Sequence, residues 1–187
     1  LLKEGITKIG AQAFDRCSLS GKLVLPSTVK EIGDYAFFSL NDITSVTFPE
    51  GLLSIGDSAF QRISLNEIDL PNSLESIGDS AFSSVPLSGE LVLGDNIRSI
   101  GASAFSAVPI TSLVLGSGIE TVGDNAFQGD QKLVSVTVEE GSTGISWGSN
   151  IFGGCVSLTS VSLPSTFQRI PESFVKACTA LEKLSLP

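Results

Sequence analysis

A six-residue phrase, Ile-Gly-x-x-Ala-Phe, recurs along this chain and constrains its fold more than any other feature. Successive copies begin 23, 23, 22, 23, 22, 25 and 23 residues apart, the last two in degenerate form, at Ile9, Ile32, Ile55, Ile77, Ile100, Val122, Trp147 and Ile170. A period of about 20–50 residues is the sequence signature of a solenoid or a similar repeat array. The sequence therefore predicts a single solenoid of about eight coils.

A second phrase, Leu-x-x-Leu-x-Leu, follows each copy of the first, as at Leu65, Ile68 and Leu70. Its end alternates between apolar and variable residues, which indicates a short strand with one buried face. Apolar residues three apart, such as Val29 and Ile32, precede the glycine position in seven of the eight coils and predict an extended segment on the opposite wall.

The segment from each glycine to the phenylalanine is predicted to be a tight turn that leads into one or two turns of α- or 3₁₀-helix. An aspartate at the first position can cap such a helix, and four copies have one: Asp34, Asp57, Asp79 and Asp124. The glycine itself requires either a positive φ or the close approach of a neighbouring backbone.

One unit of about 23 residues cannot bury its own apolar side chains. Stacking the coils at strand spacing, roughly 4.8 Å, makes a continuous core. We therefore expect one column of stacked phenylalanines, formed by Phe14, Phe37, Phe60, Phe82, Phe105, Phe127 and Phe152.

All three cysteines lie three residues after the column position, at Cys17, Cys155 and Cys178. Other coils place Leu40, Ile63, Val85 and Val108 there, so the position is predicted to hold a small buried apolar side chain. Cys155 and Cys178 would be stacked neighbours, which leaves open whether they form a disulfide. The chain has no Cys-x-x-Cys spacing and no histidine, so we expect no metal site and no cofactor.

Composition excludes several functions. The net charge is −9 with 11 dispersed Lys and Arg residues, which disfavours nucleic acid and anionic membranes as partners because these bind basic patches. No apolar run approaches the roughly 20 residues of a membrane span, so we expect no membrane insertion. Histidine, the usual general base, is absent, and we expect no catalytic residues.

The outward positions of the second phrase are the candidate ligand face, because repeat proteins bind along such extended surfaces. Our candidates for contact with a protein or glycan are Thr47, Glu67, Asp69, Glu90, Val92, Val114 and Thr137. The alternative is a solvated face without a ligand. Three carboxylates lie in its middle, but no predicted pocket accompanies them, so they do not indicate catalysis.

Trp147 is the single tryptophan and follows the longest linker of the chain. Its register replaces a core isoleucine, which favours burial. Insertions in solenoids also tend to lie at binding sites, so a loop contact with a ligand is the alternative.

The pattern Leu-x-x-Leu-x-Leu-Pro, followed by Ile-Gly-x-x-Ala-Phe-x-x-Cys, resembles the BspA-like leucine-rich repeats along the whole chain. The resemblance implies an α/β, right-handed leucine-rich-repeat solenoid, with a parallel β-sheet on one face and short extended or helical segments on the other. It also implies an extracellular or cell-surface location and a role in adhesion.

Residues 1–187 are thus expected to form one solenoid, cut from a longer array or flanked by other domains, because neither Leu1-Leu2 nor Leu186-Pro187 resembles a polar cap. Our leading hypothesis is a non-catalytic protein- or glycan-binding module of a surface or secreted protein. The alternative is a structural spacer that holds another domain away from the surface.

Overall fold

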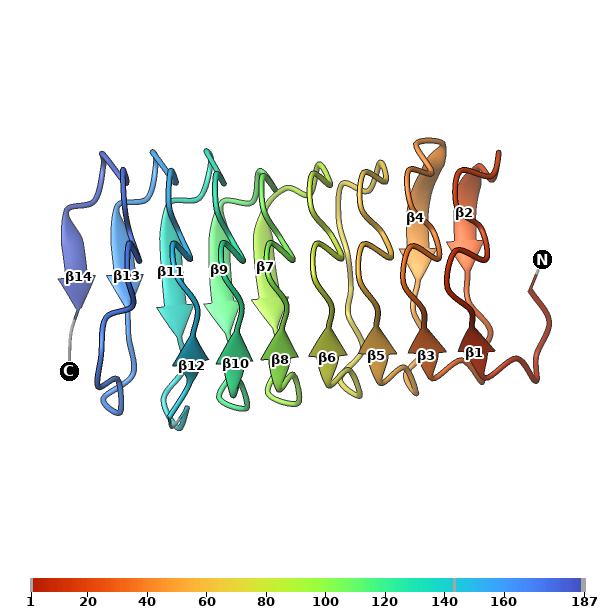
Figure 1. Ribbon diagram of the computed structural model, residues 1–187, viewed down its shortest axis with the longest axis horizontal. Coiled ribbons are helices and arrows are strands. Elements are labelled where there is room, and N and C mark those ends of the chain that lie inside the picture. The colour runs from red at the N-terminus through yellow and green to blue at the C-terminus, as the bar shows by residue number, and fades with distance from the viewer. Residues whose placement is uncertain (1, 143, 186–187) are drawn as a thin grey trace.

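The computed structural model describes residues 2–142 and 144–185, which wind into a parallel β-solenoid of about eight coils (Figure 1). Each coil passes once along each of two walls, and equivalent residues of successive coils lie side by side. The solenoid predicted from the repeat is confirmed. The terminal residues Leu1, Leu186 and Pro187, on which the expectation of cut ends depends, lie outside the described residues.

The first wall is a seven-stranded parallel sheet, built from the residue pair before each glycine. Its order is β1 (Lys8–Ile9), β3 (Glu31–Ile32), β5 (Ser54–Ile55), β6 (Ser76–Ile77), β8 (Ser99–Ile100), β10 (Thr121–Val122) and β12 (Ser146–Trp147). Register is uniform, so that Ile32 pairs with Ile55 and Ile55 with Ile77. The predicted extended segments are therefore confirmed.

The second wall comes from the leucine-rich phrase and is split into two parallel sheets. The larger sheet holds β7 (Glu90–Leu93), β9 (Ser112–Leu115), β11 (Ser135–Val138), β13 (Ser160–Ser162) and β14 (Lys183–Ser185). The smaller one holds β2 (Gly21–Val24) and β4 (Ile43–Thr47). Between β4 and β7 passes the chain of the third coil, which pairs with neither (Figure 1).

The prediction of a strand at residues 67–70 is therefore wrong. Just before this segment, the Asn66 carbonyl accepts the Ser88 N–H at 2.9 Å. Ile68 is only half-buried, whereas its equivalent Leu91 is buried. Two features of the sequence oppose pairing here. Glu67 would lie beside Glu90, and like charges on adjacent strands are unfavourable.

The second feature is Phe48, which stands where the other coils have leucine or, at Val138, valine. Its ring packs edge-on against Phe60, with centroids 5.4 Å apart. The larger side chain sits at the end of β4, next to the third coil. Its larger volume therefore hinders the close approach of residues 67–70 to β4.

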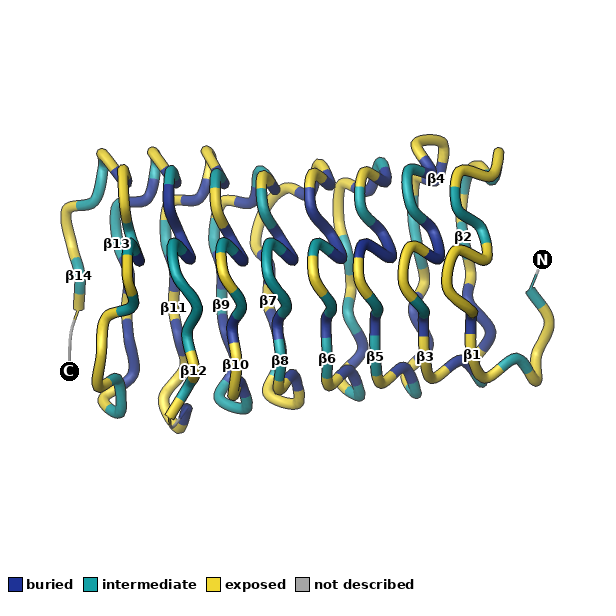
Figure 2. The backbone as a smooth tube through the Cα atoms, viewed as in Figure 1, coloured by how far each residue is buried: buried dark blue, intermediate teal, exposed yellow. Residues whose placement is uncertain are grey.

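The phenylalanine column is confirmed. Consecutive rings from Phe14 to Phe152 have centroids 5.2–5.6 Å apart and interplanar angles of 4–19°. The rings from Phe37 to Phe152 are fully buried, and Phe14 in the first coil is half-buried. Figure 2 shows this buried interior continuing through the coils from one to the next.

The predicted helical segment is wrong, since no helix forms in residues 2–142 or 144–185. Two residues per coil have positive φ there, for example Ser80 (55°) and Ser84 (59°), and a left-handed residue interrupts a right-handed helix. In exchange, the N–H groups of Ser80, Phe82 and Ser84 donate to carbonyls of the next coil at 2.8–2.9 Å. The backbone of this segment therefore forms hydrogen bonds with the neighbouring coil, which take the place of the bonds within a helix.

The aspartates after the glycines also bond between coils rather than capping helices. Asp34 Oδ1 accepts the Asp57 N–H at 3.0 Å, and Asp57 Oδ1 accepts the Asp79 N–H at 2.7 Å. The glycine permits this contact, because a Cβ on Gly78 would lie 2.6 Å from the carbonyl carbon of Gly56. Close approach of the neighbouring backbone therefore explains this glycine.

We expect Phe82→Ala to lower the free energy of unfolding by about 3–5 kcal/mol, because it opens a cavity in the middle of the column. Urea unfolding measures this loss. Val92→Ala, at a side chain that is 53% exposed, is the control and should change stability by less than about 0.5 kcal/mol. Equal stabilities of Phe82→Ala and the unchanged chain would contradict the column's role.

Candidate functional site

The candidate ligand face lies on the outer side of the second wall, which we call the sheet face. Six of its seven predicted residues are exposed, and Val114 is half-buried. The buried leucines that alternate with them, Leu91, Leu93, Leu113 and Leu115, fix the strands to the core. Side chains on this face therefore stand on a firmly held backbone.

The structure brings four of the predicted residues together and separates the other three. Val92 pairs with Val114, and Val114 with Thr137, across β7, β9 and β11. Glu90 lies at the start of the same sheet. Thr47 instead pairs with Val24 in the small sheet, on the other side of the break. The contiguous surface therefore runs from β7 toward β14.

The acidic residues do not form one cluster. Glu67 and Asp69 are exposed on the unpaired third coil, whereas Glu90 in β7 accepts a hydrogen bond from Ser112 Oγ at 3.4 Å. Among the described residues, no group of three or more Cys, Asp or Glu side chains could hold a metal ion. Likewise, no helix in the described ranges is long and apolar enough to cross a membrane.

Trp147 lies in β12, in the other wall, and is half-buried. Its ring contacts Phe167 and Phe174, with centroids 5.9 and 5.6 Å away. Trp147 thus packs into the core on one side, as its register predicts, and lines two surface hollows of about 220 and 410 Å³ on the other.

Pro171 explains why these hollows exist. In the preceding coil the Gly148 N–H donates to Val122 O at 2.7 Å, but a proline in that place has no N–H to donate. The last coil therefore does not extend the first wall beyond β12, and Arg169 and Ile170 are exposed. Arg169 lines both hollows. Sequence reasoning missed Arg169, although the loss of glycine at Pro171 marked this coil as irregular.

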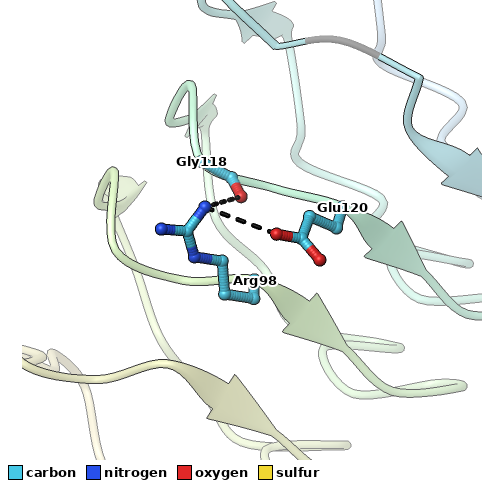
Figure 3. Close-up of polar contacts among 3 residues, drawn as sticks. All are labelled: Arg98, Gly118 and Glu120. Atoms are coloured by element: carbon cyan, nitrogen blue, oxygen red, sulfur yellow. Dashed lines mark hydrogen bonds and ion pairs between the residues drawn. The ribbon is translucent and has the colours of Figure 1, made fainter.

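Arg169 differs from Arg98, which lies at a turn of the first wall. Arg98 Nη1 is 3.4 Å from Glu120 Oε1 in the next coil and donates to Gly118 O at 3.5 Å (Figure 3). Arg169 forms no ion pair with any residue that the structure describes. Within residues 2–142 and 144–185, no acidic side chain therefore pairs directly with its charge.

Asp130 is a second residue that sequence reasoning missed. It lies three residues after Phe127, at the position held by Cys, Leu, Ile or Val in other coils, and is fully buried. Its Oδ1 accepts the Val108 N–H at 2.6 Å, while Oδ2 has no hydrogen-bond partner. Burial raises the pKa of this carboxyl to about 9, so it is protonated at neutral pH.

The three cysteines are free thiols. Cys155 and Cys178 are buried, as predicted, and each donates to the carbonyl of the column phenylalanine in the preceding coil, at 3.2 and 3.0 Å. Burial raises the pKa of the Cys155 thiol to about 12. Cys17 is exposed because the first coil has no neighbour on its outer side among the described residues. Its predicted burial is therefore wrong.

Comparison with known proteins shows the family. The BspA type leucine rich repeat region matches residues 7–134 and 98–187, with six copies. The chain therefore belongs to the BspA-type leucine-rich repeat family. Such solenoids are typically non-catalytic scaffolds. A search of curated proteins finds no significant match.

Solved structures agree with this assignment. The T. pallidum leucine rich repeat protein TpLRR is 32% identical, with a TM-score of 0.74 over 82% of this chain and 72% of its own. A leucine rich cell surface protein from Faecalibacterium prausnitzii is 21% identical (TM-score 0.53; 98% of this chain, 64% of its own). The pneumococcal vaccine antigen PcpA is 17% identical (TM-score 0.55; 97% and 60%). The last two likenesses show the fold alone.

Asp130 predicts a specific dependence of stability on pH. Below about pH 4 the carboxyl is protonated in both the folded and the unfolded chain. Between there and its folded pKa of about 9, only the unfolded chain ionises, so stability falls as pH rises, by up to about 1.4 kcal/mol per pH unit. Above the folded pKa the loss levels off.

Asp130→Asn keeps an oxygen for the Val108 N–H and removes the titration. We expect this variant to lose less stability than the unchanged chain in urea unfolding between about pH 5 and 9. Asp42→Asn, at an exposed carboxylate, is the matched control. Parallel pH profiles for the unchanged chain and Asp130→Asn would refute the buried-acid assignment.

Proposed function

We propose that this chain is a non-catalytic binding module whose protein or glycan ligand docks on the sheet face. The observation that carries the proposal is the strip of exposed Val92, half-buried Val114 and exposed Thr137 on three paired strands. Val92 is 53% exposed and lies in β7, the edge strand of the five-stranded sheet, where it pairs with Val114 of β9. An apolar strip on a flat, rigid surface is typical of an interaction site rather than of a solvated face.

The residues around this strip are polar and form a rim. Serines pair across the neighbouring positions at Ser112, Ser135 and Ser160, and they offer hydroxyl donors and acceptors without charge. The acidic residues Glu67, Asp69 and Glu90 border the strip toward the break. Interfaces commonly combine an apolar centre with a polar rim in this way.

We propose further that the module acts outside the cell, in a surface or secreted protein, and contributes to adhesion. Membership of the BspA-type family supports this location. So does the description of one fold neighbour as a cell surface protein and of another as a vaccine antigen.

Binding to a glycan and matrix-protein array tests the proposal. We expect Val92→Glu combined with Val114→Glu to weaken binding at least about tenfold, because a charge replaces apolar contact at the centre of the strip. Thr121→Glu, at an exposed position of β10 in the other wall, is the control and should bind as the unchanged chain does.

A second variant, with Glu67, Asp69 and Glu90 all replaced by Lys, tests whether the acidic border selects the partner. If the unchanged chain binds nothing at micromolar concentration, the binding function is contradicted and the spacer becomes the better account. If Thr121→Glu abolishes binding equally, the ligand does not dock on the sheet face.

A further inference from the structure

The smaller hollow beside Trp147 has the lining of a ligand pocket. Its volume is about 220 Å³, and the rings of Trp147 and Phe167 form part of its wall together with Ile145 and Pro164. Polar groups come from Gln168, Thr166 and Arg169. Pockets for drug-sized ligands measure roughly 300–1,000 Å³, so this one fits a single ring with its substituents.

The charge in this hollow is unbalanced. Within the described part of the chain, Arg169 is the one charged residue of the lining. Two acidic residues, Asp124 and Glu172, line the larger hollow, which Trp147 also lines. Glu140 does not line the smaller hollow, and its carboxylate accepts hydrogen bonds from the N–H and hydroxyl of Ser165. Asp124 Oδ1 is already engaged by the N–H and hydroxyl of Ser149, at 2.6 and 3.0 Å, and these hydrogen bonds lower its pKa.

Three side chains of the lining, Trp147, Arg169 and Gln168, therefore present three kinds of contact to a ligand. An indole face attracts the slightly positive C–H groups of a saturated ring through its negative π-surface. A free guanidinium binds a carboxylate with two parallel hydrogen bonds. The Gln168 amide adds a donor and an acceptor suited to ring hydroxyls. A sugar ring that carries a carboxylate satisfies all three groups.

We propose that the hollow beside Trp147 binds a carboxylate-bearing sugar, a hexuronic acid or similar residue of an acidic glycan, with its ring on Trp147 and its carboxylate at Arg169. The pocket exists because Pro171 ends the first wall at β12 and the last coil leaves Arg169 exposed. This hollow includes Trp147 of the first wall, whereas the sheet face is the outer side of the second wall. If the hollow binds no sugar, the proposed function of the sheet face is therefore unaffected.

Three small probes separate the contributions of ring and charge. Galacturonic acid carries both, galactose has the ring without the carboxylate, and acetate has the carboxylate without the ring. Trp147 is the single tryptophan of the chain, so a change in its fluorescence during titration reports this site. We expect galacturonic acid to bind with a dissociation constant on the order of 1 mM, and the other two at least about tenfold more weakly.

Two variants test the assigned residues by calorimetry. Trp147→Ile restores the residue found in most coils, so the fold should persist while the stacking surface is lost. Arg169→Gln removes the charge, and Arg62→Gln, at another exposed arginine, is the matched control. We expect the first two to weaken galacturonic acid binding at least about tenfold and the control to leave it unchanged.

Several results would overturn the proposal. Galactose binding as tightly as galacturonic acid would remove the role of Arg169, and acetate binding as tightly would remove that of the ring. No fluorescence change with galacturonic acid at concentrations well above 1 mM, about where half-saturation is expected, would refute the site as a whole. Retained binding by the variants Trp147→Ile and Arg169→Gln would place the sugar elsewhere.

Discussion

Hydrogen bonding and stacking between successive coils are the interactions on which the rest of this structure depends. Each coil lacks a core of its own, so its stability comes from the coils on either side. Backbone N–H groups at Ser80, Phe82 and Ser84 donate to the next coil, and the column rings stack with centroids 5.2–5.6 Å apart. The same translation from coil to coil sets the sheet register and therefore which side chains meet on the sheet face.

Periodicity in the sequence was sufficient to predict the features that repeat. The column, the paired isoleucines and most leucine-rich strands follow from register, because a residue that repeats at the coil period must stack on its equivalent. Local propensity misled where pairing between coils competes with it. A short Ala-Phe segment favours helix by local rules, yet the positive φ of Ser80 and Ser84 directs the backbone N–H groups to the neighbouring coil instead.

Departures from the repeat were harder to interpret from one sequence. Glu67 and Phe48 each look acceptable within their own coil, and their effect arises only beside Glu90 and Phe60 in adjacent coils. Arg169 became relevant because Pro171 ends the first wall, and the burial of Asp130 follows from the side chains stacked around it. The pairs Phe48–Phe60 and Glu67–Glu90 lie 12 and 23 positions apart in sequence, and a motif of a few residues does not record such pairs.

Amide hydrogen exchange of the chain tests the central claim most directly, since it reports whether each N–H is paired between coils. The account predicts strong protection at the amides of Phe60, Phe82 and Phe105, which donate to the next coil, and in β7 and β9. It predicts rapid exchange at residues 67–70, which pair with neither neighbouring strand. Protection of residues 67–70 equal to that of β7, or rapid exchange at the column amides, would contradict it.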